Sequence, residues 1–425
     1  MRGSAASRER RVLTFAFITV FLDLVGFGLI IPLLPLYVKS MGGSAVTVGF
    51  ILSSFAVTQL LATPILGRLS DRVGRRRVIL ISLAGNALSM ALFALATELS
   101  TLPLLFASRI MAGATAGNIS ACQAAVADVT RPEDRAKGMG RIGAGIGLGM
   151  VLGPVIGSSV SHLGPWAPPL FASALAVADL VGAFFFMPET KATGTSSPAA
   201  ASAAAATASA AAAAHGAAKR ATLWEALTNR GILKVFALYF LTFLYMSTIN
   251  VTLPLLTNAR LGWTEREIGH VFGLFGFMMF VIQGGLIGRL TRAWGPRNLV
   301  LAGSFASMCG LLLVSRATTA AMVAGGLLLL GIGMGVINPC LSSLASEHAG
   351  PERQGSILGF AQSAGGLARA IGPTLTGIVY THVGIAAPFA AGACVALVSV
   401  VLAFTLTRPS AAPASPSGGY RAKSE

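Results

Sequence analysis

Charged side chains stand inside long apolar stretches of the sequence, where a charge is costly, and three of them lie in the first half. They are Asp23, Arg109 and Asp179. An ionisable residue at membrane depth indicates function by default. A buried acid there can load and release a proton, whereas a buried guanidinium keeps its charge. Asp23, Arg109 and Asp179 therefore predict a proton-coupling site. The alternative for Asp23 is a structural ion pair, and Asp179 is either a second titrating or substrate-facing acid or the partner of a cation.

Further polar and soft side chains inside apolar stretches are candidates for contact with a substrate. Amide groups offer hydrogen bonds, and Met and Phe form a pliable apolar pocket. Each amide is alternatively a hydrogen bond between helices, and the Met and Phe side chains are alternatively ordinary packing. The candidates are Asn118, Gln123, Asn250, Phe275, Met279, Gln283, Asn338 and Arg369.

The composition predicts which elements hold these residues. Of the 425 residues, 54% are hydrophobic and 11% are charged, whereas a soluble chain carries roughly 25% charged residues. The surface must therefore face lipid, and a spanning helix takes about 20 apolar residues. We predict an all-α integral membrane protein with twelve transmembrane helices, one in each apolar run near 12–37, 46–66, 78–97, 102–126, 140–161, 168–187, 233–256, 268–290, 298–315, 320–345, 355–381 and 386–407.

The net charge of +16 is distributed as in a multi-pass membrane protein. With the basic N-terminal segment placed inside, nearly all Lys and Arg fall in inside loops, which is the positive-inside pattern. The exceptions are Lys39, Arg260, Arg266 and Arg316 outside, and Arg109 and Arg369 within spans. We predict a protein of the cytoplasmic membrane with both termini cytoplasmic, the lipid bilayer as its surroundings and no nucleic-acid partner.

A stretch rich in Ala separates six apolar runs from six others. We predict an N-terminal six-helix bundle over 1–190, a cytoplasmic linker over 191–222, a C-terminal six-helix bundle over 223–408 and a cytoplasmic tail over 409–425. The linker reads either as a flexible tether, because of its Ser, Thr, Gly and Pro residues, or as a helix, because Ala favours helix.

The two halves repeat each other. Gly67-Arg68-Leu69-Ser70 matches Gly288-Arg289-Leu290-Thr291, and Gly153-Pro154 matches Gly372-Pro373, with an offset of about 220 residues in both cases. A repeat of this kind predicts two pseudo-symmetric bundles with a binding site between them near the midplane.

The loop after the second run combines glycines, one acid and several arginines. Anchoring to lipid headgroups explains the arginines, but it requires neither Gly67 and Gly74 nor Asp71. The loop resembles the signature loop of the major facilitator superfamily, with Arg292 standing where the repeat of Asp71 would be. That resemblance implies the major facilitator fold and a cytoplasmic latch between the halves, to which Gly67, Asp71, Arg72, Gly74 and Arg75 belong.

Four glycines recur every four residues in the fifth run. Gly145, Gly149, Gly153 and Gly157 form one smooth stripe on a helix, which favours close helix packing, and Pro154 adds a bend. The segment resembles the antiporter motif of proton-coupled drug-efflux families. That resemblance implies that these residues take part in conformational change.

Two further motifs surround the charged residues named first. The order Asp-x-x-Gly-x5-Pro-x-x-Pro, beginning at Asp23, is similar to the first-span motif of twelve-span drug:proton antiporters, in which the acid takes part in coupling. Arg109 and the glycines after it resemble the fourth-span motif, whose arginine is placed near the proton site. By this resemblance, Arg109 tunes Asp23.

The chain looks most like the tetracycline-efflux branch of these antiporters, on the basis of its first span, its signature loop and Gly262-Trp263 followed by Gly269. Three polar positions of that branch are replaced, by Ser89, Met279 and Ser307. These replacements argue against tetracycline as the substrate, because the groups expected to meet a metal-chelated drug are missing.

The sequence carries no Walker loop, metal-ligand cluster or nucleophile elbow. We therefore expect neither an enzyme nor a bound cofactor or metal. The prediction is a monomer that exports small amphipathic compounds in exchange for protons by alternating access. The alternatives are an exporter or facilitator of an endogenous metabolite, and a transport-fold membrane sensor or scaffold.

Overall fold

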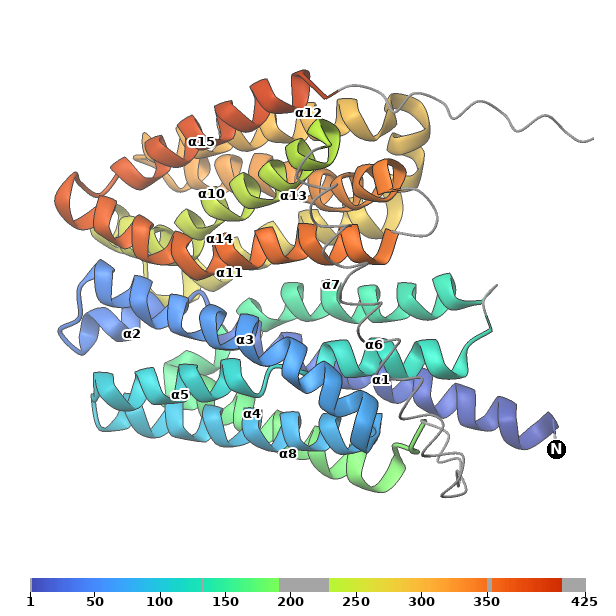
Figure 1. Ribbon diagram of the computed structural model, residues 1–425. Helices are drawn as coiled ribbons and strands as arrows, with labels where there is room; N and C mark the ends of the chain where they lie inside the picture. The colour runs from blue at the N-terminus through green and yellow to red at the C-terminus, as the bar shows by residue number, and fades with distance from the viewer. Residues whose placement is uncertain (1, 132–133, 191–228, 350–353, 407–425) are drawn as a thin grey trace, which may run out of the picture.

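The structure is a computed structural model that describes residues 2–131, 134–190, 229–349 and 354–406. The predicted linker (191–222) and tail (409–425) lie outside these residues. The described chain runs back and forth as helices between two ends of the molecule (Figure 1). We call the end that holds the turn before Arg75–Arg77 the basic end, and the other the opposite end.

The first half of the chain begins at the basic end and returns to it. Its elements are α1 (Arg2–Ile30), α2 (Leu34–Ser40), α3 (Ala45–Val73), α4 (Arg75–Glu98), α5 (Leu102–Ala114), α6 (Asn118–Val129), α7 (Arg135–Val160), the 3-10 turn η1 (Ser161–Leu163) and α8 (Ala167–Phe186). The second half repeats this course with α10 (Arg230–Leu261), α11 (Glu265–Val281), the π-helical segment η2 (Ile282–Leu286), α12 (Ile287–Ser315), α13 (Ala320–Ala349), α14 (Gln354–His382) and α15 (Ala387–Phe404).

These helices form the twelve predicted spans. Nine described segments are long and apolar enough to cross a membrane by length and composition. One of them, Glu265–Ser315, contains two spans because the chain turns at Gly295, where φ is 76° and ψ is 156°. The remaining spans are α5 with α6, and α14.

Two spans are broken near their middle or end. Pro32 lacks a backbone donor, and the chain leaves α1 at Ile30 and resumes as α2 at Leu34, with Pro35 in its first turn. The predicted run near 102–126 is divided by a turn over 115–117 into α5 and α6. A turn at this depth is tolerated where it is enclosed by protein.

The chain forms two bundles, each built around apolar cores that come almost entirely from its own helices. In the first half α1 packs on α6, α7 and α8, while α4 packs on α5 and α8. In the second half α10 packs on α14 and α15, while α12 packs on α13 and α15. Figure 1 shows the second half stacked above the first, so the described chain confirms the predicted pair of six-helix bundles.

The two bundles meet along two helix pairs, α3 with α14 and α7 with α11. Lys39 Nζ donates to Asn258 Oδ1 at 2.8 Å, and the hydroxyls of Ser53 and Thr374 lie 2.9 Å apart. A Cβ placed on Gly49 would come 2.8 Å from Thr374 Cα. These contacts lie toward the opposite end, where α3 begins, so the halves are closed against each other there.

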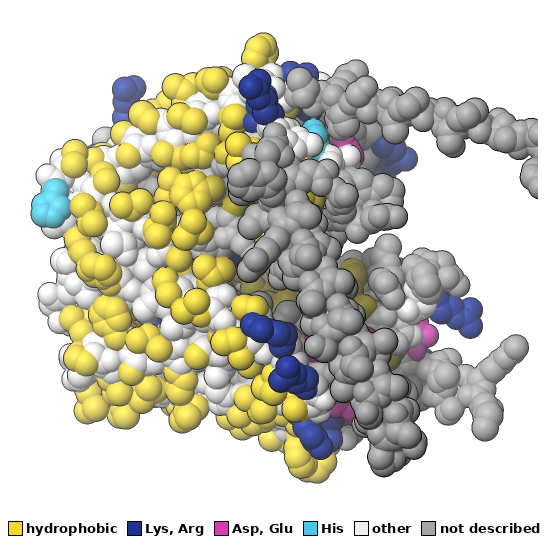
Figure 2. Space-filling model, in the orientation of Figure 1, with side chains coloured by type: hydrophobic (Ala, Val, Ile, Leu, Met, Phe, Trp, Pro, Cys, Tyr) yellow, Lys and Arg dark blue, Asp and Glu magenta, His cyan; other side chains and the backbone are white. Residues whose placement is uncertain are grey.

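The outer surface is apolar over the length of the helices. Phe185 is 73% exposed and Phe404 is 68% exposed, with Leu61, Ile65 and many other aliphatic side chains also exposed. Figure 2 shows such side chains spread over the face of the molecule. An apolar surface of this extent suits contact with lipid tails.

Candidate functional site

Asp23 lies on α1 and is held by an amide from a neighbouring helix. Asn86 on α4 donates from Nδ2 to Asp23 Oδ1 at 3.0 Å. The Asn118 side chain at the start of α6 also interacts with Asp23, while its own Oδ1 accepts from the backbone nitrogen of Ile119 at 2.9 Å. The Asp23 side chain remains half-buried. It therefore joins three helices of the first half and keeps part of its surface accessible.

Asp179 on α8 is more deeply enclosed. It is 4% exposed, and its Oδ1 accepts from the Thr19 hydroxyl on α1 at 3.0 Å. Its Oδ2 is buried without a hydrogen-bond partner. A buried ionised carboxylate needs a partner for its charge. This environment therefore suits a neutral acid that holds a proton.

The two acids belong to one cluster. Thr19 and Asp23 are four residues apart on α1 and so share a face of the helix, and Thr19 contacts Asp179, so this face of α1 brings the two acids near each other. The sequence indicated both acids but not Thr19 or Asn86, because a hydroxyl and an amide in a membrane helix carry no signal until the neighbouring helix is known.

Arg109 on α5 is buried against an aromatic ring rather than against an acid. It is 2% exposed, and its guanidinium carbon lies 4.7 Å from the centre of the Phe93 ring. Its Nη2 donates to Met90 Sδ at 3.5 Å, and its Nε is buried without a partner. Among the described residues no ion pair joins Arg109 to Asp23. The tuning of Asp23 by Arg109 thus stays a prediction.

We expect Arg109→Lys to impair transport and to lower the melting temperature. Lysine keeps the charge but loses the flat stack on Phe93, and a buried cation–π contact contributes on the order of 1–2 kcal/mol. Gradient-driven transport and thermal unfolding of the purified protein measure the two effects. The exposed Arg289→Lys is the matched control, and equal behaviour of the two variants would contradict the expectation.

The predicted substrate contacts divide into exposed and packed side chains. Phe275 is buried in the core of the second half, and Met279 packs against the same core. Gln123 on α6 is exposed, as is Gln283 in the π-helical segment η2. The half-buried amides are Asn250 on α10 and Asn338 on α13. Phe275 and Met279 thus serve packing in this conformation.

Arg369 on α14 also lies beside an aromatic ring. Its guanidinium carbon is 4.4 Å from the centre of the Phe243 ring on α10. The side chain is half-buried, and no ion pair reaches it in the part of the chain that the structure describes. Phe243 was not indicated by the sequence, since an aromatic residue in an apolar run usually means packing.

The glycine stripe of α7 packs on α1. A Cβ on any of Gly145, Gly149, Gly153 or Gly157 would come within 3.1 Å of α1, often of its backbone. The ring of Pro154 faces α1 as well. The stripe therefore allows the two helices to touch along their length, as its spacing predicts.

A second glycine stripe lies on α11 and faces α7 from the other half. A Cβ on Gly276 would lie 2.8 Å from the Met150 carbonyl oxygen, and one on Gly273 would lie 2.6 Å from Val155 Cγ2. Gly269 similarly faces Ser158. The spacing of these three glycines in the sequence, four and then three residues, could have indicated that they share one face of the helix. They make the α7–α11 contact between the halves as close as the contact within the first half.

The signature loop is tied to its own half by a charge network. Arg75 donates to Asp71 Oδ1 at 2.5 Å and to Asp128 Oδ2 at 3.1 Å, while its backbone nitrogen donates to Glu189 Oε1 at 2.9 Å. Gly74 has φ of 104° and contacts the Glu189 carboxylate, which leaves no room for a side chain. Asp128 lies at the end of α6, and Glu189 lies just beyond the end of α8. The sequence did not indicate either residue. The network joins the ends of four spans, α3, α4, α6 and α8, at the basic end.

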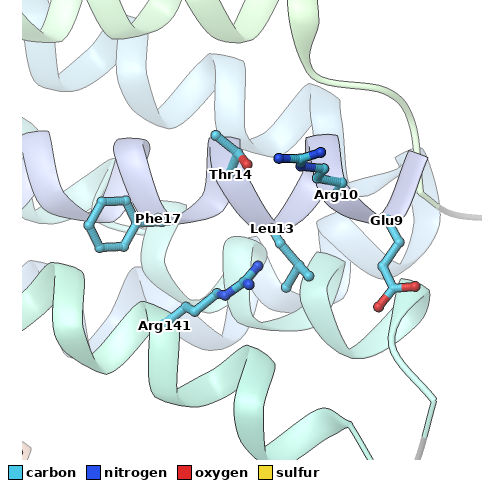
Figure 3. Close-up of a pocket in the computed structure, with 6 residues that line it drawn as sticks. All are labelled: Glu9, Arg10, Leu13, Thr14, Phe17 and Arg141. Atoms are coloured by element: carbon cyan, nitrogen blue, oxygen red, sulfur yellow. The ribbon is translucent and has the colours of Figure 1, made fainter. Parts of the chain in front are cut away.

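A cavity of about 710 Å³ lies at the basic end between α1 and α7. Glu9, Arg10, Leu13, Thr14, Phe17 and Arg141 line it (Figure 3). Figure 3 shows Arg141 extending from α7 toward α1. The halves are thus closed against each other at the opposite end, and the first half carries a cavity at the basic end.

Comparison with known proteins places the chain in a family. The family model for the Major Facilitator Superfamily matches residues 16–373 and 235–424. The chain is 32% identical over 422 residues to the human Major facilitator superfamily domain-containing protein 10, covering 90% of each chain. It is 32% identical over 382 residues to the class E tetracycline resistance protein of Escherichia coli, covering 87% of this chain and 88% of that one.

Solved structures agree with this placement. The crystal structure of the human organic anion transporter MFSD10 (TETRAN) is 29% identical and covers 93% of this chain and 99% of its own, with a TM-score of 0.66. The nucleoside transporter NupG, at 16% identity and a TM-score of 0.72 over 93% of this chain and 98% of that one, shares the fold. The chain therefore belongs to the Major Facilitator Superfamily and is a membrane transporter rather than an enzyme.

Proposed function

We propose that this transporter exports small amphipathic compounds in exchange for protons, as a monomer in the cytoplasmic membrane. The basic end would face the cytoplasm, because Lys and Arg concentrate in the loops at that end. Similarity to tetracycline resistance proteins supports export of a drug-like compound. Ser89 and Ser307, both buried, remain the reason to expect a substrate other than tetracycline.

The observation that carries the proposal is the acid cluster of the first half. Asp23 is partly accessible and bonded to Asn86, while Asp179 is sealed and bonded to Thr19. A carboxyl group that alternates between a neutral and a charged form is the simplest proton carrier. Arg109 and Arg369 keep their charge and so are suited to respond to that change without titrating.

We propose that alternating access arises from rocking of the units 1–190 and 223–408 about α3–α14 and α7–α11. The contacts of Gly49, Ser53 and Lys39 close the opposite end, while the cavity beside Arg10 and Arg141 opens at the basic end. This conformation would accept a compound from the cytoplasm. The segment 191–222 would tether the two units.

Transport into proteoliposomes with an imposed pH gradient tests the proposal. A panel of amphipathic compounds is offered, and proton movement is recorded beside uptake of the compound. We expect uptake that requires the gradient and that carries protons in the opposite direction. Uptake that proceeds equally without a gradient and moves no protons would contradict antiport and favour a facilitator.

Asp71→Asn is expected to shift the conformations toward an open basic end and to slow turnover. In this conformation the side chain of Asp71 is 64% exposed and pairs with Arg75 of its own half. The predicted latch to the other half would form when the basic end closes, and an exposed pair of that kind contributes about 0.2–1 kcal/mol. The shift in population is therefore at most about fivefold. Labelling of single cysteines at each end by a polar maleimide measures it, with the exposed Glu98→Gln as control. Unchanged labelling at both ends would contradict a latch at Asp71.

A further inference from the structure

Arg369 places a positive charge at membrane depth in the second half. It stands 15 residues into the 29-residue helix α14, or about 22 Å along it at 1.5 Å per residue. α14 packs on α10 of its own half and on α3 of the other half. A guanidinium at this depth keeps its charge, so it requires either a counter-charge or access to water.

The charge has no acidic partner in the described chain. The Phe243 ring covers one face of the guanidinium at 4.4 Å, and no ion pair or hydrogen bond accompanies it. The contrast with Arg109 is informative: the Nε of Arg109 is buried, whereas Arg369 has no buried nitrogen without a partner and its side chain is half-buried. The polar edge of Arg369 is therefore turned to accessible space.

Two consecutive glycines let neighbouring side chains pack closely beside Arg369, since a Cβ on Gly365 would lie 2.7 Å from Phe243 Cδ2. A Cβ on Gly365 would lie 3.6 Å from Nη1 of Arg369, and a Cβ on Gly366 would lie 3.8 Å from Nη2. The absence of a side chain at Gly365 thus allows the Phe243 ring to lie against the guanidinium. The Gly366 position also faces Leu60 Cδ1 of α3, at 3.1 Å. The site thus combines a planar cation, an aromatic ring and an aliphatic wall from the other half.

The cavity at the basic end also has more positive than negative side chains. The cavity between α1 and α7 is lined by Arg10 and Arg141 and by one acid, Glu9. A cavity lined by more cations than anions raises the local concentration of negatively charged compounds at that end of the molecule.

We propose that Arg369 binds the anionic group of the substrate, and that the substrate class is an amphipathic organic anion such as an aromatic carboxylate or sulfonate. This inference rests on the transport function proposed above. The planar guanidinium matches a carboxylate or sulfonate with two parallel hydrogen bonds, and Phe243 and Leu60 receive the apolar body. Contact with Leu60 on α3 would couple occupancy of the site to the position of the other half.

Binding by the purified full-length protein, without a pH gradient, tests the site. Three probes share one ring system and differ in charge: indole-3-acetate, indole-3-acetamide and tryptamine. We expect wild type to bind the carboxylate at least about tenfold more tightly than the amide or the amine, because a hydrogen bond to a charged group contributes that much or more. Arg369→Gln is expected to remove this preference, and Arg369→Lys to keep part of it.

A purely structural role for Arg369 gives a different result. In that case Arg369→Gln lowers the melting temperature but leaves the order of the three probes unchanged. The exposed Arg316→Gln serves as the matched control for loss of one positive charge. Absence of a preference for the carboxylate in wild type, or an unaltered preference in Arg369→Gln, overturns the proposal. Because no gradient is applied, these outcomes are independent of whether transport is coupled to protons.

Discussion

Replacing Asp23 with Asn is expected to abolish transport driven by a pH gradient. Asn has the same shape and retains a hydrogen bond to Asn86, but it cannot exchange a proton. Asp23 lies on α1 with part of its surface accessible, so it is the acid of the cluster that protons reach most directly. Uphill transport in proteoliposomes should fall to the leak of empty vesicles, while substrate binding and downhill exchange persist.

Asp179→Asn provides the internal comparison. Asp179 is 4% exposed and bonded to Thr19, so its proton has no direct path to solvent. We expect this variant to transport more slowly but to remain coupled. Asp134→Asn, in which the altered side chain is exposed and makes no capping bond, controls for loss of a carboxylate. Two results would assign proton coupling to Asp179 instead. One is full gradient-driven activity in Asp23→Asn, and the other is loss of that activity in Asp179→Asn but not in Asp23→Asn.

The fold follows from the sequence because each span must satisfy its own backbone in lipid. Apolar runs of sufficient length therefore become helices, and the repeat across Gly153-Pro154 and Gly372-Pro373 indicates two related bundles. The position of the break over 115–117 did not follow, because those residues continue an apolar run. A turn at that depth depends on the neighbours that enclose it.

The site was predictable in part. A lone acid such as Asp23 or Asp179 is visible because its burial is costly. The residues that contact the charged groups could not be predicted in the same way. Thr19, Asn86 and Phe243 contact them only because of how neighbouring helices are rotated toward each other. Hydrophobic periodicity shows that a helix is buried but does not specify how it is rotated against its neighbours.

Adding one methyl group at Gly377 is expected to open the opposite end. A Cβ there would meet the backbone of α3, 2.8 Å from the Ala45 carbonyl carbon and 2.9 Å from Val46 Cα. Backbone atoms cannot turn away as a side chain does, so α14 and α3 must separate. Overpacking of this kind costs about 1–3 kcal/mol. That cost falls on the conformation in which the opposite end is closed, which is the one described here.

The consequence is a shift in population of roughly 5- to 150-fold away from closure at the opposite end, together with slower turnover. A cysteine at Ser53, which is 7% exposed and bonded across the interface to Thr374, reports the separation. Labelling of the protein in nanodiscs, in a background without the native cysteines, should accelerate in Gly377→Ala. Gly359→Ala on the same helix is the matched control, because a Cβ there meets nothing within 4 Å. Equal labelling rates in the two variants would show that the contact of α3 with α14 does not hold the opposite end closed, and that closure depends instead on the glycine stripe between α7 and α11.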